Sequence, residues 1–386
     1  MEEKIRNILI VVDDFKIGGI QRIALDQAYA LNENGISATI IVLGSEPYKN
    51  IPSFIYTEKE LIARLDIKFL FLDGSKYEQF RKLLVHLKST QSELLICYSL
   101  KGTVLSYLCK KFIKRKPRVV TIIEQLLSMS APVQRVRRIF YSQFTDILFA
   151  YSEAVKKDWD YRRKHNLFIK LISYRRNISV CRNGVYLPRI YFNQSEFSNS
   201  TNKIKRLIFV NRLTAWKGLP VALKIIESKE FSNTSLLLVT PDDPNKYLSD
   251  VNSEVRDRIL SIVGKSVSQI DFYPGDLHIY PASYGPSSRY IEAISINVLE
   301  MACFGVKSFV TKNGVDTWPE LVEDGMICEV DWSNAQSAIN TILKNGVSAK
   351  VPEINNAREL IDVKNNLNKI FSAAGLGKFA EARLGT

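Results

Sequence analysis

Short apolar runs alternate with amphipathic stretches along this sequence, and this alternation limits the possible folds more than any other feature. Asn7–Val12 (NILIVV) is continuously apolar, as expected of a strand buried on both faces of a parallel sheet. A glycine turn and a segment of helical spacing that ends near Gly35 follow it. Further strands are predicted at Ala38–Leu43, Leu94–Tyr98, Val119–Ile123 and Ile147–Ala150. This order is typical of an α/β protein.

The same pattern begins again after a polar stretch, Asn193–Lys203 (NQSEFSNSTNK), which we interpret as a linker. Strands are predicted after it at Leu207–Val210, Leu236–Val239, Leu277–Tyr280 and Ser308–Val310, and helices near 333–344 and 355–373. With 386 residues the chain is too long for one ordinary domain. The sequence therefore predicts two α/β domains, residues 1–192 and 203–365.

Composition is that of a globular protein, 46% hydrophobic and 24% charged. No apolar run reaches the ~18 residues of a membrane-spanning helix, and the N-terminal MEEKIRNILIVV does not resemble a signal peptide. The five cysteines are widely spaced without a C-x-x-C pair, which argues against a disulfide framework and for buried free thiols. We therefore expect a cytoplasmic protein.

Positive charge is concentrated in the first half of the chain. Residues 1–190 hold 32 Lys and Arg against 18 Asp and Glu, whereas residues 191–386 hold 21 against 22. Such a field attracts an anionic partner. Nucleic acid, an anionic membrane surface and a phosphorylated acceptor are the candidates, and a solvated face that only maintains solubility is the alternative.

Two cations follow the first strand of the second domain, in LIFVNRLTAWKGLPVALKII. Arg212 leaves the carboxyl end of that strand and Lys217 lies just before a helix. Ligands of open α/β sheets bind at this edge. An arginine and a lysine here can hold a diphosphate, the first through its planar fork and the second as a point charge. Two surface cations on a loop are the alternative.

Two glutamates lie eight positions apart in YIEAISINVLEMACFG, where an apolar-periodic helix ends at Gly305. On one straight helix Glu292 and Glu300 would be ~12 Å apart and could not converge. They can reach a common ligand if Glu292 lies in the preceding loop and Glu300 in the first turns of the helix. The backbone amides of Ser295, Ile296, Asn297 and Val298 would then point at that ligand.

A third candidate is the turn with Gly18 and Gly19 in VVDDFKIGGIQR, where backbone amides can approach a phosphate closely. It is not the G-x-G-x-x-G of a dinucleotide site. Asp13 and Asp14 are adjacent rather than spaced as D-x-D, and we predict no metal site.

These segments resemble the family 4 retaining glycosyltransferases, of the bacterial surface-polysaccharide type. The similarity is carried by Glu292, Glu300, the helix MACFG, the upstream HIYPASY and the cations Arg212 and Lys217. It implies the GT-B fold, two Rossmann-like domains facing across a cleft, with residues 366–386 crossing back to the N-terminal domain. Gly18 and Gly19 match a family turn beside the donor phosphates, and Arg182–Val185 (RNGV) matches a structural segment.

The resemblance also implies an activity. A metal-independent, retaining hexosyltransferase without a cofactor would transfer sugar from a nucleoside diphosphate sugar to a saccharide or a lipid-diphosphate-linked acceptor, in cell-surface polysaccharide synthesis. Glu292 would bind the donor sugar, Glu300 the ribose, and Arg212 and Lys217 the diphosphate. Where relatives carry a histidine near the sugar, this sequence has Glu124, a weak acceptor-side candidate.

The charge asymmetry then predicts peripheral contact with an anionic membrane, at the inner face of the cell. The expected partners include no nucleic acid, because the basic region lacks a recognisable binding module. Three alternatives remain open: a non-catalytic relative that binds nucleotide sugar or acts as a scaffold, a nucleic-acid-binding protein, and a GT-B epimerase.

Overall fold

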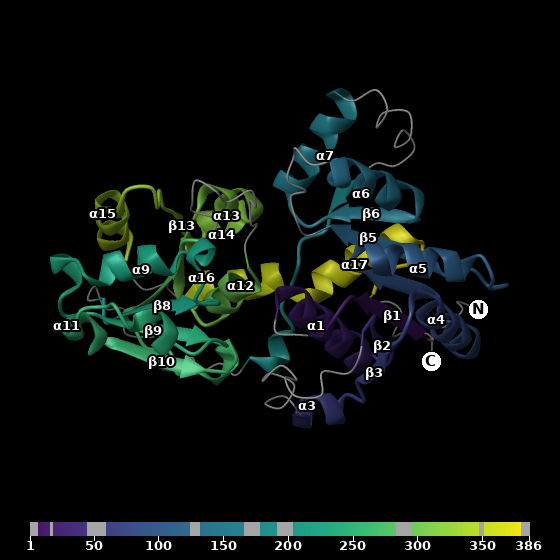
Figure 1. Cartoon of the computed structure of the whole chain (residues 1–386), viewed down its shortest axis with the longest axis horizontal. Coiled ribbons are helices and arrows are strands. Elements are labelled where there is room, and N and C mark those ends of the chain that lie inside the picture. The colour runs from purple at the N-terminus through teal and green to yellow at the C-terminus, as the bar shows by residue number, and fades with distance from the viewer. Residues whose placement is uncertain are drawn as a thin grey trace. The chain divides into compact units, whose positions relative to one another are not determined.

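The computed structural model describes residues 7–15, 18–44, 59–123, 132–165, 178–190, 204–282, 295–346 and 351–379. The chain forms two compact units, which are described separately (Figure 1). Unit 1 comprises residues 1–186 and 362–386, and unit 2 comprises residues 187–361. The units therefore divide after residues 186 and 361, whereas the sequence places the limits at 192, 203 and 365. The predicted linker Asn193–Lys203 lies outside the described residues.

Unit 1 contains a seven-stranded sheet in the order β3-β2-β1-β4-β5-β6-β7, with every pair of neighbours parallel. Its strands are β1 (Asn7–Val12), β2 (Ser37–Val42), β3 (Lys68–Phe71), β4 (Leu94–Cys97), β5 (Arg118–Ile123), β6 (Ile147–Ala150) and β7 (Ser179–Val180). Its helices are α1 (Gly19–Glu33), α3 (Lys59–Arg64), α4 (Lys76–Thr90), α5 (Leu100–Lys110), α6 (Pro132–Gln143), α7 (Glu153–His165) and α17 (Val363–Ala374). The five predicted strands are confirmed, and the order reverses between β1 and β4.

Helices cover both faces of this sheet, because right-handed crossovers that run in opposite directions from β1 and β4 place their helices on opposite sides. On one face, Leu83 and Leu87 of α4 and Cys109 of α5 pack against a core that includes Leu9 and Val11 of β1. On the other, α17 packs on α1, whose own contacts are with β1 and β2. A buried polar network fixes α17 there.

The centre of that network is Asn366, which is 4% exposed. Its Oδ1 accepts a hydrogen bond from Gln27 Nε2 on α1 (2.7 Å), and its Nδ2 donates to the carbonyl of Arg182 (2.8 Å). The amide of Val363 donates to the carbonyl of Val185 (3.0 Å). The RNGV segment thus holds the C-terminal helix in unit 1.

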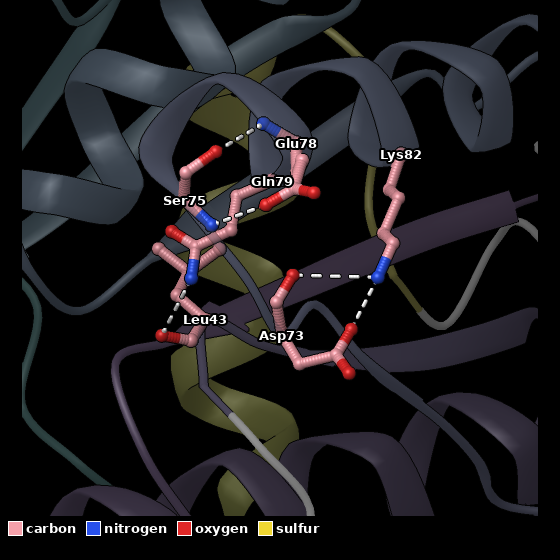
Figure 2. A network of polar contacts seen from close by, with 6 residues as sticks. All are labelled: Leu43, Asp73, Ser75, Glu78, Gln79 and Lys82. Atoms are coloured by element: carbon pink, nitrogen blue, oxygen red, sulfur yellow. Dashed lines mark hydrogen bonds and ion pairs between the residues drawn. The ribbon is translucent and has the colours of Figure 1, made fainter.

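The start of α4 shows how local sequence sets a boundary (Figure 2). The Ser75 hydroxyl accepts from the Glu78 amide and the Glu78 carboxylate accepts from the Ser75 amide, which is a capping box. One turn further on, Lys82 donates to both the carbonyl and the carboxylate of Asp73, and this bond lowers the pKa of the Asp73 carboxyl. Gln79 Nε2 donates to the carbonyl of Leu43 and joins α4 to the end of β2.

Unit 2 contains a six-stranded parallel sheet in the order β10-β9-β8-β11-β12-β13. Its strands are β8 (Arg206–Val210), β9 (Ser235–Thr240), β10 (Ile259–Val263), β11 (Asp276–Tyr280), β12 (Lys307–Val310) and β13 (Ile327–Glu329). Its α-helices are α9 (Leu219–Ile226), α10 (Asn245–Leu248), α11 (Ser253–Arg256), α12 (Ile296–Cys303), α13 (Lys312–Thr317), α14 (Pro319–Glu323), α15 (Ala335–Asn345) and α16 (Val351–Ile361). Its short 3-10 turns are Leu187–Arg189, Ala215–Lys217, Lys229–Phe231 and Val267–Gln269.

The order of this second sheet reverses between β8 and β11. Helices α9 and α15 pack on the core formed by Leu207, Phe209, Leu277 and Ile279, and α12 packs on α16 and contacts β11 and β12. The four strands predicted for this half are confirmed within one residue at each end. The strands β10 and β13 are not predicted.

One predicted helix, 355–373, is two helices, α16 and α17, separated at Asp362. The Asp362 carboxylate accepts from the Lys364 amide (2.9 Å) and caps α17, and the Asp362 backbone forms a parallel bridge with Val185. The chain passes from unit 2 to unit 1 at the same residue. The apolar periodicity of the sequence continues through Asp362, so the sequence pattern does not reveal that the helix ends there.

All five cysteines are free, as predicted, and four of them are buried. Burial raises the pKa of the Cys97, Cys109 and Cys181 thiols to about 12, so these are inert packing groups. Of the helices within the described ranges, none has the length and apolar character needed to cross a membrane.

Candidate functional site

The loop between β8 and α9 carries the two predicted cations at the carboxyl edge of the second sheet. The amide of Leu213 donates to Oδ2 of Asp242 (2.6 Å), and the Asp242 amide donates to the Thr240 hydroxyl (3.0 Å), so the end of β9 fixes the shape of the loop. Arg212 is exposed, whereas Lys217 is 8% exposed. The two cations therefore sit in different environments, and Lys217 is the one shielded from water.

Gly218 determines where Lys217 lies. Its φ of 87° is in the left-handed region, and a Cβ at this position would lie 2.5 Å from Pro281 Cγ, just after β11. Only glycine allows the loop after β8 to approach the end of β11 this closely. Lys217 Nζ lies 6.0 Å from the centre of the Tyr280 ring, within range of a cation–π interaction. The cation is thus held where the strand order reverses, which is the usual ligand site of open α/β sheets.

We expect Gly218→Ala to lower the free energy of unfolding by about 3 kcal/mol, because the substitution combines left-handed strain with overlap on Pro281. Gly325→Ala is the control, since Gly325 has a similar φ of 70° but no atom of the described residues within 4 Å of the added Cβ. Gly325→Ala should lower the free energy of unfolding by only about 1 kcal/mol. Urea denaturation measures this free energy for both variants, and an equal decrease in both would show that overlap with Pro281 adds nothing.

The start of α12 lies beside the end of β8. Ser295 caps the helix, and Asn297 Nδ2 donates to the carbonyl of Val210, the last residue of β8 (3.0 Å). The Asn297 amide already donates to Ser295 Oγ (3.4 Å) and the Val298 amide to the Ser295 carbonyl (3.0 Å). Two of the four amides that the sequence predicts to face a ligand, those of Asn297 and Val298, thus have partners in the helix cap, and their contact with a ligand stays a prediction. The side chains of Ile296 and Val298 are buried in the core.

Glu300 lies in the second turn of α12, in agreement with its predicted place in the helix, and is 3% exposed. Its Oε1 lies 2.7 Å from Nη1 of Arg189, and the two side chains are 4% and 1% exposed. Arg189 was not among the predicted residues, because its partner lies far along the chain. The signal that could have located it is an arginine four positions after the RNGV segment.

The turn with Gly18 and Gly19 is in unit 1, at the start of α1 and beside the reversal of the first sheet. Ser99, which follows β4, donates to the Asp13 carboxylate, and Gln21 donates to the Asp14 carboxylate (2.9 Å). A Cβ on Gly18 would meet Oε1 of Gln21 at 2.4 Å, whereas a Cβ on Gly19 would meet nothing within 4 Å. Packing within the described protein therefore does not require glycine at position 19.

The structure brings Arg212, Lys217, Asn297 and Glu300 to the region where β8, β11 and α12 meet, together with Ser295, Ile296 and Val298. Glu292 and Glu124, the predicted donor-sugar and acceptor-side residues, lie outside the described residues. Groups of acidic, histidine and cysteine side chains able to hold a metal are not found among the residues that were described.

Known structures with the same architecture are numerous. A glycosyltransferase from Rickettsia africae aligns with 99% of this chain and of its own, at a TM-score of 0.67 and 14% identity. HepE from Anabaena, in complex with UDP-glucose, covers 96% of this chain and 99% of its own, at a TM-score of 0.64 and 14% identity. An α-glucosyltransferase in complex with UDP and a 13-mer DNA covers 96% of this chain and 99% of its own, at a TM-score of 0.58 and 12% identity.

Neither family models nor curated protein sequences match the chain. The structural similarity therefore defines the class of fold. The chain has the GT-B architecture, built from two Rossmann-like domains with parallel sheets, as the sequence predicts.

Proposed function

We propose that this chain is a retaining, metal-independent glycosyltransferase that moves a sugar from a nucleoside diphosphate sugar to a saccharide or lipid-linked acceptor. The observation that carries the proposal is the fixed place of Lys217, between the Tyr280 ring and the Gly218–Pro281 contact, at the reversal between β8 and β11. A cation already held in place can stabilise a diphosphate leaving group without reorganisation. The GT-B fold of the chain, and the UDP-glucose bound to HepE, support the same activity.

Each site residue has a proposed role in this reaction. Lys217 and Arg212 bind the diphosphate, Glu300 binds the ribose, and Glu292 binds the donor sugar. The bond between the anomeric carbon and the phosphate oxygen breaks, and a bond to the acceptor hydroxyl oxygen forms on the same face. The proton of that hydroxyl passes to the departing diphosphate oxygen. Because two cations can offset the charge on the diphosphate, we expect activity without a divalent metal or other cofactor.

The Gly18–Gly19 turn is proposed to receive a donor phosphate. The space around a Cβ on Gly19 and the helix N-terminus behind it are both suited to an anion. Packing among the described residues does not account for glycine at position 19, whereas close approach by a ligand would.

A thermal-shift screen with UDP-, GDP-, ADP- and dTDP-sugars tests the proposal. We expect one nucleotide class to raise the melting temperature of the wild type. Glu300→Gln should reduce that rise, each protein being compared with its own ligand-free melting temperature. Glutamine is preferred to alanine because it leaves less unfilled space beside Arg189. Absence of any shift at millimolar concentration would overturn the donor-site proposal.

A non-catalytic relative would also show this shift, so a second measurement separates the two functions. An active transferase slowly releases free sugar from its donor when water replaces the acceptor, whereas a binding protein or scaffold does not. Release of inverted or epimerised sugar would instead favour an epimerase or an inverting enzyme. The anomeric configuration of the released sugar can be followed by NMR.

The acceptor is proposed to be lipid-linked and reached at an anionic membrane by one surface of unit 1. This aromatic–basic surface comprises Tyr107, Leu108, Lys111, Phe112, Phe140 and Phe144, at the ends of α5 and α6. Phe112, Leu108 and Phe140 are 63%, 41% and 38% exposed. Phe140 stacks on Phe144, which meets the Tyr107 ring edge-on, and Lys111 Nζ lies 4.9 Å from that ring.

The charge around this surface fits the same partner. From residue 94 to residue 145 the chain has ten Lys and Arg but only one acidic residue, Glu124. Basic residues near an anionic bilayer contribute about 1 kcal/mol each, and exposed aromatic rings favour its interfacial region. Exposed apolar side chains among cations are better explained by a lipid surface than by solubility alone.

We expect the protein to float with phosphatidylglycerol vesicles at low salt, and Phe112→Gln to weaken that binding about tenfold through lost apolar burial. Tyr247→Gln is the control, because Tyr247 is 40% exposed but belongs to unit 2. Equal binding to phosphatidylcholine vesicles, or no binding to phosphatidylglycerol vesicles, would contradict the proposal. Tight binding to generic DNA in a gel-shift assay would instead favour a nucleic-acid partner.

A further inference from the structure

Arg189 is one of the most deeply buried charged residues of unit 2. It ends the 3-10 turn Leu187–Arg189, immediately after the chain leaves unit 1 at Tyr186. The residue is 3% exposed, and its Nη1 lies 2.7 Å from Oε1 of Glu300. The pair thus joins the first turn of unit 2 to the helix α12, whose start lies against β8.

Glu300 needs this partner if it is to act as an anion. The Glu300 side chain is 4% exposed, and an isolated carboxylate buried to this extent is expensive to keep ionised. A guanidinium offsets that cost. It also restricts where the carboxylate lies, through the attraction of opposite charges at 2.7 Å rather than through a directed hydrogen bond.

The carboxylate lies near the site that it would serve. Asn297 and Glu300 are three positions apart, so they are neighbours on one face of α12. Asn297 donates to the carbonyl of Val210, and Asn211 and Arg212 follow that residue at the tip of β8. Asn211 is 8% exposed, and its Nδ2 is buried without a hydrogen-bond partner among the described residues. A polar ligand group is therefore expected at this edge.

A contact that only stabilises the fold does not need a buried ion pair. Apolar residues of similar volume stabilise a protein interior at least as well as a buried ion pair. An ionised carboxylate, however, has two oxygens that each accept hydrogen bonds, and the contact with Arg189 uses Oε1. Its other oxygen, Oε2, can then serve a ligand.

We propose that Arg189 is a positioning residue for the nucleotide: it holds Glu300 ionised and oriented so that Oε2 accepts hydrogen bonds from the ribose hydroxyls. This inference rests on the proposed function, because it assumes a nucleotide at the β8–β11 edge. Arg189 itself need not touch the ligand. Its loss should therefore alter how the protein distinguishes ribose from a sugar without hydroxyls, more than its affinity for phosphate.

The test compares dissociation constants of UDP, GDP and ADP with those of their 2′,3′-dideoxy analogues, by titration calorimetry. For the nucleotide that binds, wild type should prefer the ribose form about tenfold or more, since the hydrogen bonds are to a charged group. Arg189→Met and Glu300→Gln should both reduce that preference to near one. Arg189→Lys should restore part of it, and provides a second variant if the methionine protein does not fold.

Rescue by Arg189→Lys is a further readout that a purely structural role would not produce, because lysine restores the positive charge beside Glu300. A variant that binds both nucleotide forms more weakly by the same factor would overturn the inference, as would a Glu300→Gln protein that keeps its preference. Wild type that binds no nucleotide would instead overturn the proposed function itself.

Discussion

Lys217→Ala lowers the catalytic efficiency of sugar transfer by about 100-fold, if this cation stabilises the leaving diphosphate as proposed. The effect should be large because Lys217 is 8% exposed and lies near the Tyr280 ring, where electrostatic interactions are weakly screened. Removing it leaves the diphosphate with the exposed Arg212 alone. Arg212→Ala should have a smaller effect, about tenfold, since solvent screens that side chain more strongly.

The measurements are the rate of sugar release from the donor and the dissociation constant of the nucleoside diphosphate, neither of which requires a known acceptor. Lys224→Ala is the matched control, because Lys224 is an exposed cation on α9 in the same unit. A Lys217→Ala protein that binds and reacts like the Lys224→Ala protein would show that the cation is a structural feature of the loop. Adding Mg²⁺ should not restore the lost activity if the reaction is independent of metal.

The sequence predicts those site residues that directly follow a strand or lie at the start of a helix. Arg212 and Lys217 were predicted because β8 is a continuous apolar run, and side chains after such a strand lie at the ligand edge of a parallel sheet. The contact of Gly218 with Pro281 and the ion pair of Arg189 with Glu300 join distant parts of the chain. Periodicity reports local structure and carries no signal for such contacts.

The same limit explains the errors in the fold. Strands buried on both faces, such as β1 and β8, were located within one residue. The edge strand β10 is largely exposed and is not predicted, although four of the five residues of its sequence, ILSIV, are apolar. The break at Asp362 depends on a backbone bridge to Val185, and this contact is made only in the folded chain.

Acid should destabilise unit 2 through His278, an effect that does not depend on the proposed function. This histidine is fully buried in β11, where Nδ1 lies 2.9 Å from Ser308 Oγ and Nε2 has no hydrogen-bond partner among the described residues. Burial lowers its pKa from the usual 6.5 to about 3, so the folded protein keeps the ring neutral. Below pH 6.5 the unfolded chain binds a proton that the folded chain does not.

Stability from this group is therefore fully present above pH 6.5 and is lost as the pH falls toward 3. The loss should amount to about 2 kcal/mol between pH 7 and pH 5, at about 1.4 kcal/mol for each pH unit below the ordinary pKa. His278→Asn can keep a hydrogen bond to Ser308 but cannot titrate. Between pH 7 and pH 5 its free energy of unfolding should therefore fall by about 2 kcal/mol less than that of the wild type. Urea denaturation at pH 7, 6 and 5 measures the difference.

The matched control is His86→Gln, because His86 is only partly buried and lies on α4 in unit 1. Its pKa is also lowered by burial, but the residue is only partly buried, so this variant should lose a smaller part of the pH dependence than His278→Asn. A His278→Asn protein that follows the wild type from pH 7 to pH 5 would mean that the ring is protonated in the folded state. The sheet would then have to open at His278 to admit water, and the loop carrying Lys217, which rests on the end of the same strand, would lose its support.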